Sequence, residues 1–217
     1  MTGRPRVRWI AAGVGAAYAV LVRPRLQTWG ATRAESAGGL PGDDLVRARW
    51  QTTRAVSIAA PPQDVWPWLV QMGFGRAGWY SYDRLERAIG IGDFAEGNSA
   101  RSVLPQFQSL AVGDPVPLGP GTGLTAAVVD PPRALVLRMT MNALTGAPAR
   151  DGDRVLLDWT WAFVVVPAGP RSCRLIARVR ADYRPRSLGL LIPLLLEPPH
   201  LLMERAMLRG IRRRTAG

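Results

Sequence analysis

The sequence predicts an α+β domain in which an antiparallel sheet is covered by a long C-terminal helix, with two short helices after the first strand. Three patterns lead to this fold class: an alternating segment that ends in prolines near residue 60, a run of alternating segments from residue 114 to residue 183, and an apolar helical face near the C-terminus. The 217 residues, 47% of them hydrophobic, are enough to bury one core of this kind.

The first strand and the two short helices are predicted within residues 54–89. Residues 54–59 alternate between side chains of different polarity, as expected of a strand with one covered face. Pro61 and Pro62 end this strand and set the backbone for the start of a helix. Apolar residues then recur at helical spacing from Val65 to Met72, and after a glycine-rich turn a second helix is expected to end at Ile89.

A run of alternating segments makes up the middle of the chain. Five further strands are expected at residues 114–118, 124–129, 134–141, 157–166 and 174–183. Glycine and proline turns separate most of them, and consecutive strands with short links form an antiparallel sheet. Alternation places Trp159, Trp161 and Phe163 on one face of their strand, which we expect to be the covered face.

The last element is predicted to be a helix from Pro199 to Arg214, after an apolar run that Pro193 interrupts. His200, Met203 and Met207 share one side of this helix. A long helix with an apolar side requires a surface to cover, and the predicted sheet provides one.

The N-terminal region divides into two parts. Trp9 to Val22 is uncharged and flanked by arginines, but shorter than the ~20 residues that span a bilayer. We expect residues 1–27 to form a basic, apolar membrane anchor that is not cleaved, although Ala17-Tyr18-Ala19 also has the form of a signal-peptide cleavage site. Residues 28–49 have turn chemistry and no apolar period, so we interpret them as a linker to a folded domain at residues 50–217, expected on the cytoplasmic side.

Charge indicates a partner surface. All 28 basic residues are arginine against 16 acidic residues, and the net charge of +12 is concentrated before Glu35 and from Arg205 onward. Anionic lipid and nucleic acid both attract such ends. Single-stranded nucleic acid would also need aromatic side chains among the arginines, and these ends have almost none. We therefore expect a membrane surface as a partner, through Trp9 to Val22 and the terminal arginines, and no nucleic acid.

Several catalytic and cofactor sites are excluded. A single cysteine, Cys173, rules out an internal disulfide and a thiolate metal cluster. Gly73 to Gly78 fits G-x-G-x-x-G, but a proline precedes it where a central parallel strand is required, so a glycine turn between helices is expected instead. His200 is the single histidine and lies on an apolar helix side, where it is expected to pack or to line a cavity. We predict no catalytic residue, metal or cofactor.

Wide aromatic and methionine side chains gather on the predicted covered face. Such a set is typical of a plain core, and also of an adaptable apolar pocket under a helix. The residues predicted to line a ligand cavity are Trp66, Tyr80, Tyr82, Met139, Met141, Trp159, Trp161, His200, Met203 and Met207.

Five segments carry a family resemblance. Thr53 to Gly73, with Ala60-Pro61-Pro62-Gln63-Asp64-Val65-Trp66 at its centre, resembles the opening of the SRPBCC superfamily (START-like, polyketide cyclase and Bet v 1-related proteins). The segments that resemble a bacterial subgroup with an N-terminal membrane segment are 29–32 with 40–43, Gly78-Trp79-Tyr80-Ser81-Tyr82-Asp83, and 203–211. The resemblance implies the helix-grip fold, with a cavity between the sheet and the long helix.

These observations together predict a function class. We expect the chain to bind or carry an apolar small molecule, a lipid or polyketide-like compound, in the cavity and at a membrane. One alternative is a cyclase- or hydratase-like enzyme on the same fold that uses His200 or a cavity tyrosine as acid or base. Another is a membrane-associated interaction domain without a ligand. The superfamily has no shared catalytic motif to carry over, and fold alone does not give function.

Overall fold

The computed structural model describes residues 18–189 and 197–215. A turn of π-helix, η1 (Tyr18–Val22), leads into the short helices α2 (Arg23–Gln27) and α3 (Arg33–Ala37). The sheet and its helices follow in the order β1 (Trp50–Ile58), α4 (Pro62–Val70), α5 (Asp83–Ala88), the 3-10 turn η2 (Pro105–Phe107), β2 (Pro115–Gly119), β3 (Thr122–Asp130), β4 (Ala134–Asn142), β5 (Leu156–Gly169), β6 (Ser172–Arg184) and α7 (Glu197–Arg214). The predicted fold class is confirmed, and each predicted strand corresponds to an observed one.

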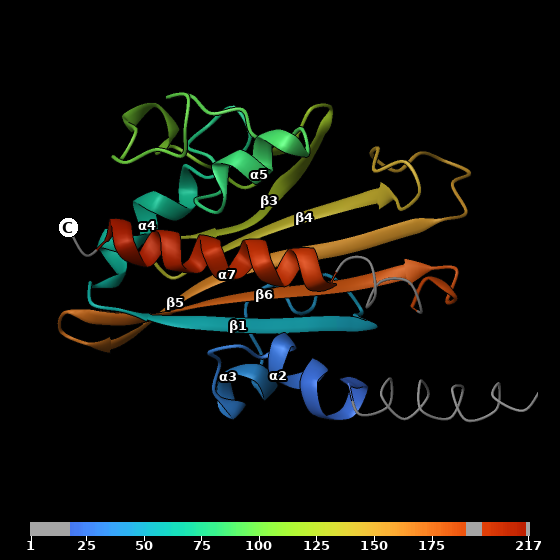
Figure 1. The fold of residues 1–217 in the computed structure, drawn as a ribbon, viewed down its shortest axis with the longest axis horizontal. Helices are drawn as coiled ribbons and strands as arrows, with labels where there is room; N and C mark the ends of the chain where they lie inside the picture. Colours follow the sequence, from blue (N-terminus) through green and yellow to red (C-terminus); the bar gives the residue numbers. More distant parts are fainter. Residues whose placement is uncertain (1–17, 190–196, 216–217) are drawn as a thin grey trace, which may run out of the picture.

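One antiparallel sheet organises the molecule (Figure 1). Its six strands lie in the order β1-β6-β5-β4-β3-β2, so the first strand pairs with the last. This order follows from the sequence: hairpin links join β2 to β6 in series, while the helices α4 and α5 let β1 reach the other edge. The longest pairing, between β5 and β6, places Trp161 opposite Val179 in the middle of the sheet.

Helix α7 lies across one face of the sheet, which we call the inner face (Figure 1). The inner face carries the alternate residues that the sequence predicted, among them Trp159, Trp161 and Phe163 of β5. Met207 and Ile211 of α7 are buried in the same core. A sheet that holds one long C-terminal helix in this way is the helix-grip fold.

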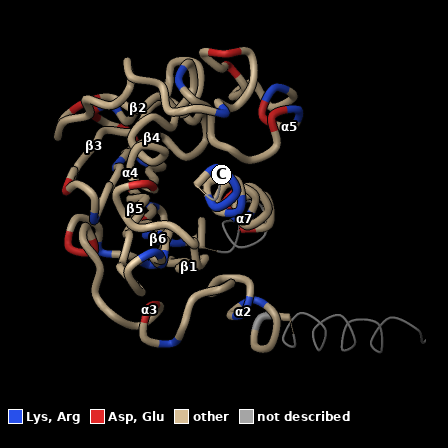
Figure 2. Tube along the Cα trace, turned by 90° about the vertical axis from the view of Figure 1, so that its left-hand side faces the viewer, with Lys and Arg blue, Asp and Glu red and all other residues tan. Residues whose placement is uncertain are grey.

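The opposite, outer face of the sheet is covered by the segment that precedes β1 (Figure 2). Val164 and Ile176 point to this side and are buried, with Ala31 and Leu40 packed against them. Gly42 lies so close to Val136 that a Cβ atom there would be 2.6 Å from a valine methyl group. Residues 28–49 are therefore part of the folded domain, and the interpretation of this segment as a linker is wrong. The segment covers the sheet with turns and small side chains, which leave no apolar period in the sequence.

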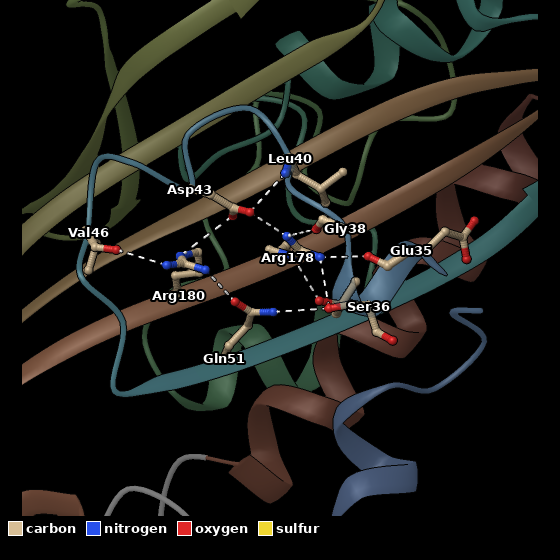
Figure 3. Close-up of polar contacts among 10 residues, drawn as sticks. Glu35, Ser36, Gly38, Leu40, Asp43, Val46, Gln51, Arg178 and Arg180 are labelled. Carbon is tan, nitrogen blue, oxygen red and sulfur yellow. Dashed lines mark hydrogen bonds and ion pairs between the residues drawn. The ribbon is translucent and has the colours of Figure 1, made fainter. Parts of the chain in front are cut away.

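Arg178 of β6 holds this segment in place (Figure 3). Its side chain is 1% exposed and its guanidinium donates to the backbone oxygens of Gly38, Glu35 and Ser36 and to the carboxylate of Asp43, at 2.6–3.2 Å. A buried charge is tolerated when it is paired and its donors are satisfied, as here. On the outer face these polar contacts add to the apolar packing of Val164 and Ile176.

The G-x-G-x-x-G stretch forms a tight turn between α4 and α5, as predicted. Gly73, Gly75 and Gly78 all have positive φ, and Gly73 pairs with Gly78 across the turn. The turn delivers Tyr80 to α7, where Gly210 allows the close approach: a Cβ atom on Gly210 would lie 2.2 Å from the Tyr80 carbonyl oxygen.

The predicted membrane anchor falls largely outside the described residues, since only Tyr18 to Val22 of its apolar stretch are described. Across residues 18–189 and 197–215, no helix combines the length and the apolar character needed to cross a bilayer.

Candidate functional site: a cavity between the sheet and α7

A cavity lies between the inner face of the sheet and α7, in two adjoining parts. The first part is about 220 Å³ and is lined by Trp50, Met141, Leu157, Trp159, Val179, Ala181, Pro199, His200 and Met203. The second part is about 190 Å³ and is lined by Trp79, Ser81, Ile91, Leu118, Trp159, Trp161, His200, Met203, Glu204 and Met207. Trp159, His200 and Met203 belong to both parts. Large rings on β5 and the side chains of α7 hold the helix away from the sheet and leave this space.

Aromatic rings form much of the wall of the second part. Trp79 stacks on Trp161 with ring centroids 5.4 Å apart and an angle of 20° between the ring planes. Trp161 also contacts Trp159, Phe163 and His200, with centroids 5.0–6.2 Å apart. These contacts fix the orientation of rings that would otherwise rotate to fill the space.

A buried ion pair lies behind this wall. Arg54 of β1 and Glu204 of α7 are 1% and 0% exposed, and the Arg54 Nη1 donates to the Glu204 carboxylate. Trp161 Nε1 donates to the other oxygen of the same carboxylate at 2.8 Å. Arg54 Nε donates to the Leu26 backbone oxygen at 3.1 Å, which ties α2 to the pair. The pair thus joins the sheet, α7 and the N-terminal segment at one point.

His200 is held by the same arginine. Arg54 Nη1 lies 3.0 Å from His200 Nδ1, and because a guanidinium can only donate, Nδ1 accepts. Burial is the main cause that lowers the pKa of His200 below its ordinary value of 6.5; Arg54 lowers this pKa further, and Glu204 opposes the shift. The neutral imidazole with its proton on Nε2 is therefore favoured.

Among the residues that the structure describes, no tyrosine lines either part of the cavity. Tyr80 is 1% exposed, its hydroxyl donates to the Trp68 backbone oxygen at 3.1 Å and accepts from Gln71 at 2.9 Å. Burial raises the pKa of the Tyr80 hydroxyl, so this group stays protonated. Tyr82 is 46% exposed and lies on the surface.

The structure brings together six of the ten side chains that the sequence predicted for a cavity, namely Met141, Trp159, Trp161, His200, Met203 and Met207. The other four lie outside both parts. Met139 and Tyr80 are buried in the core, Trp66 packs against its edge from α4, and Tyr82 is exposed. Tyr80 and Tyr82 miss the cavity because the turn before α5 directs Tyr80 toward α4 and Gly210, and leaves Tyr82 at the surface. The binding role of all ten remains a prediction.

Sequence reasoning missed the polar part of the site. Arg54 shares its strand face with Val56 and Ile58, so an arginine at an inward position was a signal of a buried partner. Glu204 lies four residues after His200, on the same side of α7. Trp50 and Trp79 also line the cavity, and Trp50 was identifiable only once the start of β1 was known.

A second surface lies where α2 meets α7, and we call it the α2/α7 face. It contains a groove of about 320 Å³ lined by Tyr18, Leu26, Gln27, Arg54, Glu197, Pro198, Leu201, Leu202 and Arg205. Arg23 of α2 pairs with Glu197 at 2.6 Å, and this contact raises the pKa of Arg23. Arg205 and Arg209 lie over the ring of Trp29, 4.9 and 5.2 Å from its centroid. The N-terminal segment and α7 thus form one surface.

No family model matches the sequence, and no curated protein matches it. Solved structures give weak likenesses. Norcoclaurine synthase from Thalictrum flavum is 17% identical, covers 76% of this chain and 84% of its own, and has a TM-score of 0.39. Protein MLL2253 from Mesorhizobium loti is 16% identical, with 76% and 96% covered and a TM-score of 0.41. A protein from Arthrobacter aurescens is 14% identical, with 76% and 86% covered and a TM-score of 0.40. Likeness at this level carries no argument about this chain, whose fold follows from its own strand order and helix placement.

Proposed function

We propose that this chain binds an apolar small molecule, a lipid or polyketide-like compound, in the cavity between the sheet and α7. The observation that carries the proposal is the two-part cavity, whose walls meet at Trp159, His200 and Met203. Small-molecule sites are concave and mostly apolar, and the walls of both parts are almost entirely apolar. The sequence resemblance to the SRPBCC superfamily supports the same proposal, since its members share a cavity in this place.

Apolar burial supplies the affinity in this proposal. Each Å² of apolar surface removed from water contributes roughly 25 cal/mol before the cost of ordering the ligand. Met141 and Met203 suit an adaptable wall because an unbranched thioether side chain adjusts to different shapes. Arg54 occupies Nδ1 of His200, and Gln71 and Trp68 occupy the hydroxyl of Tyr80, so neither side chain has a free basic atom; this favours carriage over acid–base chemistry.

Filling the cavity tests the proposal. Met203 belongs to both parts, so Met203→Trp should obstruct both, whereas Leu144→Trp adds the same bulk at a position that is 75% exposed between β4 and β5. Titration of the full chain with N-phenyl-1-naphthylamine should show saturable emission that weakens about tenfold or more in Met203→Trp and is unchanged in Leu144→Trp. Equal binding by the two variants would show that the probe binds elsewhere and would contradict the proposal. Mass spectrometry of an organic extract of the purified protein identifies a carried molecule directly.

We also propose that the chain works at an anionic membrane, through the α2/α7 face and η1, the turn that leads into α2. Val20, Leu21 and Val22 are 71%, 57% and 43% exposed, and Leu202 of α7 is 49% exposed. Exposed apolar side chains beside arginines are the combination that binds at a lipid interface. The first part of the cavity is lined by Trp50, at the start of β1, and by Pro199 and His200, at the start of α7. These residues lie next to Glu197, which pairs with Arg23 of α2.

Vesicle flotation tests the membrane proposal. The full chain should float with vesicles that contain phosphatidylglycerol more than with phosphatidylcholine alone, and Val20→Glu/Leu21→Glu should reduce this binding. Val112→Glu/Leu144→Glu is the matched control, since both of its positions are exposed and neither lines the groove of the α2/α7 face. Equal flotation of the two double variants would reject this face as the membrane contact.

A further inference from the structure

A further pocket lies between α5 and the C-terminal end of α7, and we call it the arginine pocket. It has a volume of about 420 Å³ and, unlike the two parts of the cavity, it exposes polar atoms as well as apolar ones. Its walls include Arg84 and Arg87 from α5 and Arg213 and Arg214 from α7. Basic residues are marked on both of these helices in Figure 2. The pocket shares Ser81 with the second part of the cavity and, among the described residues, none with the groove of the α2/α7 face.

The positive charge of this pocket has little compensation. Among the described residues, none of its four arginines forms an ion pair. Asp83 is the single carboxylate among the described lining residues, and its two oxygens accept from Ser99 at 2.6 and 3.1 Å. Glu86 of α5 is buried and does not line the pocket, and burial raises the pKa of its carboxyl. The lining residues therefore carry an excess of positive charge.

Three of the four guanidinium groups belong to exposed residues, so a ligand can reach them. Arg84, Arg87 and Arg213 are all exposed. Within the described part of the chain, no hydrogen bond occupies the guanidinium of Arg84 or of Arg213. Arg87 uses Nη2, which donates to the Gly97 backbone oxygen and to Asn98 Oδ1. Most N–H groups of these three side chains are therefore available to a ligand.

Arg214 is held in a fixed position beside them. Its Nε donates to the Ala100 backbone oxygen at 2.7 Å, and its Nη1 and Nη2 donate to the backbone oxygens of Gly210 and Ser99 at 3.2 and 3.4 Å. Its guanidinium carbon lies 4.6 Å from the centroid of the Tyr80 ring. Each Nη carries two hydrogens, so these contacts leave further donors on Arg214.

The arginines at this place repel one another. Burial lowers the pKa of Arg214 below its ordinary value of 12.5, and the charges of Arg213 and Arg101 lower this pKa further, while Tyr80 and Asp83 oppose the shift. The contacts of the fold thus compensate the charge only in part. An anion placed among these arginines would remove the repulsion.

We propose that the arginine pocket binds the phosphate group of a phosphate monoester, to which Arg84, Arg87 and Arg213 donate while Arg214 lies fixed beside them. A guanidinium matches two phosphate oxygens with two parallel hydrogen bonds, and such charge-assisted bonds are strong. A dianion also balances the excess of positive charge better than a monoanion does. The phosphate belongs either to a soluble ester or to a lipid headgroup, because both present the same group. The site goes beyond the proposed function, since the described walls of the cavity and of the α2/α7 groove include none of these arginines.

Calorimetric titration of the full chain with phenyl phosphate and phenyl sulfate tests the site. The two probes have nearly the same shape, but at about pH 7.5 phenyl phosphate is mainly a dianion, because its second pKa is about 6, whereas phenyl sulfate is a monoanion. We expect phenyl phosphate to bind about tenfold more tightly than phenyl sulfate. Arg84→Gln/Arg213→Gln should weaken the binding of phenyl phosphate about tenfold or more, because it removes two sets of charged donors.

A charge-matched variant separates the pocket from the general attraction of a basic protein. Arg150→Gln/Arg171→Gln makes the same change in net charge at two exposed positions that do not line the pocket, and it should bind phenyl phosphate as the wild-type protein does. Circular dichroism establishes that both double variants are folded, and their substituted positions are all exposed.

Vesicles identify the source of the phosphate. Phosphatidic acid carries a phosphate monoester and phosphatidylglycerol a diester, and the two are compared at equal surface charge. A lipid headgroup is the ligand if Arg84→Gln/Arg213→Gln loses flotation with phosphatidic acid and the charge-matched variant keeps it. A soluble ester is the ligand if both variants float alike and only the calorimetric affinity of Arg84→Gln/Arg213→Gln falls. If the two variants behave alike in both assays, the site is overturned, and equal affinity for phenyl phosphate and phenyl sulfate would overturn the phosphate monoester as its ligand.

Discussion

Arg54 of β1 and Glu204 of α7 form an ion pair that is almost completely buried between the sheet and the helix, with side chains 1% and 0% exposed. Trp161 donates to the carboxylate and His200 accepts from the guanidinium, so both cavity residues depend on this pair for their orientation. A buried pair loses hydration that its attraction only partly restores, so its main effect is on geometry rather than on stability. We interpret it as the contact that sets the height of α7 above the sheet.

The first prediction follows from that pair. Glu204→Gln leaves the Arg54 charge buried without a counterion and should lower the free energy of unfolding by about 3–5 kcal/mol. Urea unfolding followed by circular dichroism measures the change. Glu96→Gln makes the same chemical change at an exposed position outside the pair and should be close to neutral.

The double variant Arg54→Met/Glu204→Leu separates charge from packing. Replacing both partners by apolar groups of similar volume is often neutral or stabilising, so this variant should be more stable than Glu204→Gln. Because Trp161 and His200 lose their partners, the affinity of the cavity for N-phenyl-1-naphthylamine should still change. A double variant less stable than the single one would show that the pair itself stabilises the fold.

The second prediction concerns pH. The pKa of His200 is below its ordinary value of 6.5 in the folded protein, chiefly because of burial, so between these two pKa values the unfolded chain binds more protons than the folded chain. The contribution of His200 to the free energy of unfolding is therefore complete above about pH 6.5. It is lost as the pH falls toward and through the pKa of His200 in the folded protein. Unfolding free energies measured between pH 8 and pH 5 should show this loss.

His200 is the single histidine of the sequence, which makes the effect separable. His200→Gln should flatten the pH dependence in this window, while carboxylates such as Glu35, whose pKa is lowered mainly by Arg174, still contribute to the fall at more acidic pH. The imidazole signal in a proton NMR titration should report a pKa below 6.5 in the wild-type protein. A midpoint above 6.5 would mean that Glu204 dominates over burial.

The third prediction tests the outer face. Arg178→Met leaves the carboxylate of Asp43 and the backbone oxygens of residues 35–38 without their donor, and should lower the free energy of unfolding by about 3–5 kcal/mol. Arg138→Met is the matched control, because Arg138 pairs with Asp158 in a 41% exposed position on the same face, and such pairs contribute about 0–1 kcal/mol. Hydrogen exchange should accelerate across residues 35–46 in Arg178→Met alone. Unchanged exchange there would show that the segment is held by other contacts.

The inner face was predictable because the pattern that defines it lies within single strands and within one helix. Alternation along β5 places Trp159, Trp161 and Phe163 on one side whatever the rest of the chain does, and the spacing of Met203 and Met207 defines one side of α7 in the same way. A sheet face and a helix side that are both apolar have few ways to be buried. The strands and the covered face therefore followed from the sequence.

The outer face and the polar centre were not predictable because they depend on long-range polar pairs. Arg178 meets Asp43 across 135 residues and Arg54 meets Glu204 across 150. The inward position of Arg54 on its strand indicates burial, but no local pattern identifies its partner. The segment before β1 lacks an apolar period because backbone oxygens and small side chains cover the sheet there. Tyr82 was misplaced for a related reason, since the positive-φ turn at Gly78 and Tyr80 decides its direction.

The fourth prediction concerns Trp161, whose indole is 8% exposed, stacks on Trp79 and donates to Glu204. Trp161→Ala should lower the free energy of unfolding by about 3–5 kcal/mol, because it removes a packed ring and leaves a space that the sheet cannot close. The space adjoins the second part of the cavity, so the variant should bind larger probes than the wild-type protein does. Trp161→Phe keeps a ring and removes the donor, and should change stability less and probe size hardly at all.

Trp66→Ala is the control for this change, because Trp66 packs at the edge of the core and lines neither part of the cavity. Its loss should reduce stability without changing which probes bind. A series of naphthalene, anthracene and pyrene derivatives, titrated against all three variants, distinguishes a wider cavity from a merely weaker fold, since a weaker fold lowers the affinity for every probe alike. If Trp161→Ala binds the series with the size preference of the wild-type protein, the indole does not limit the cavity, and the walls that select the ligand lie on α7 instead.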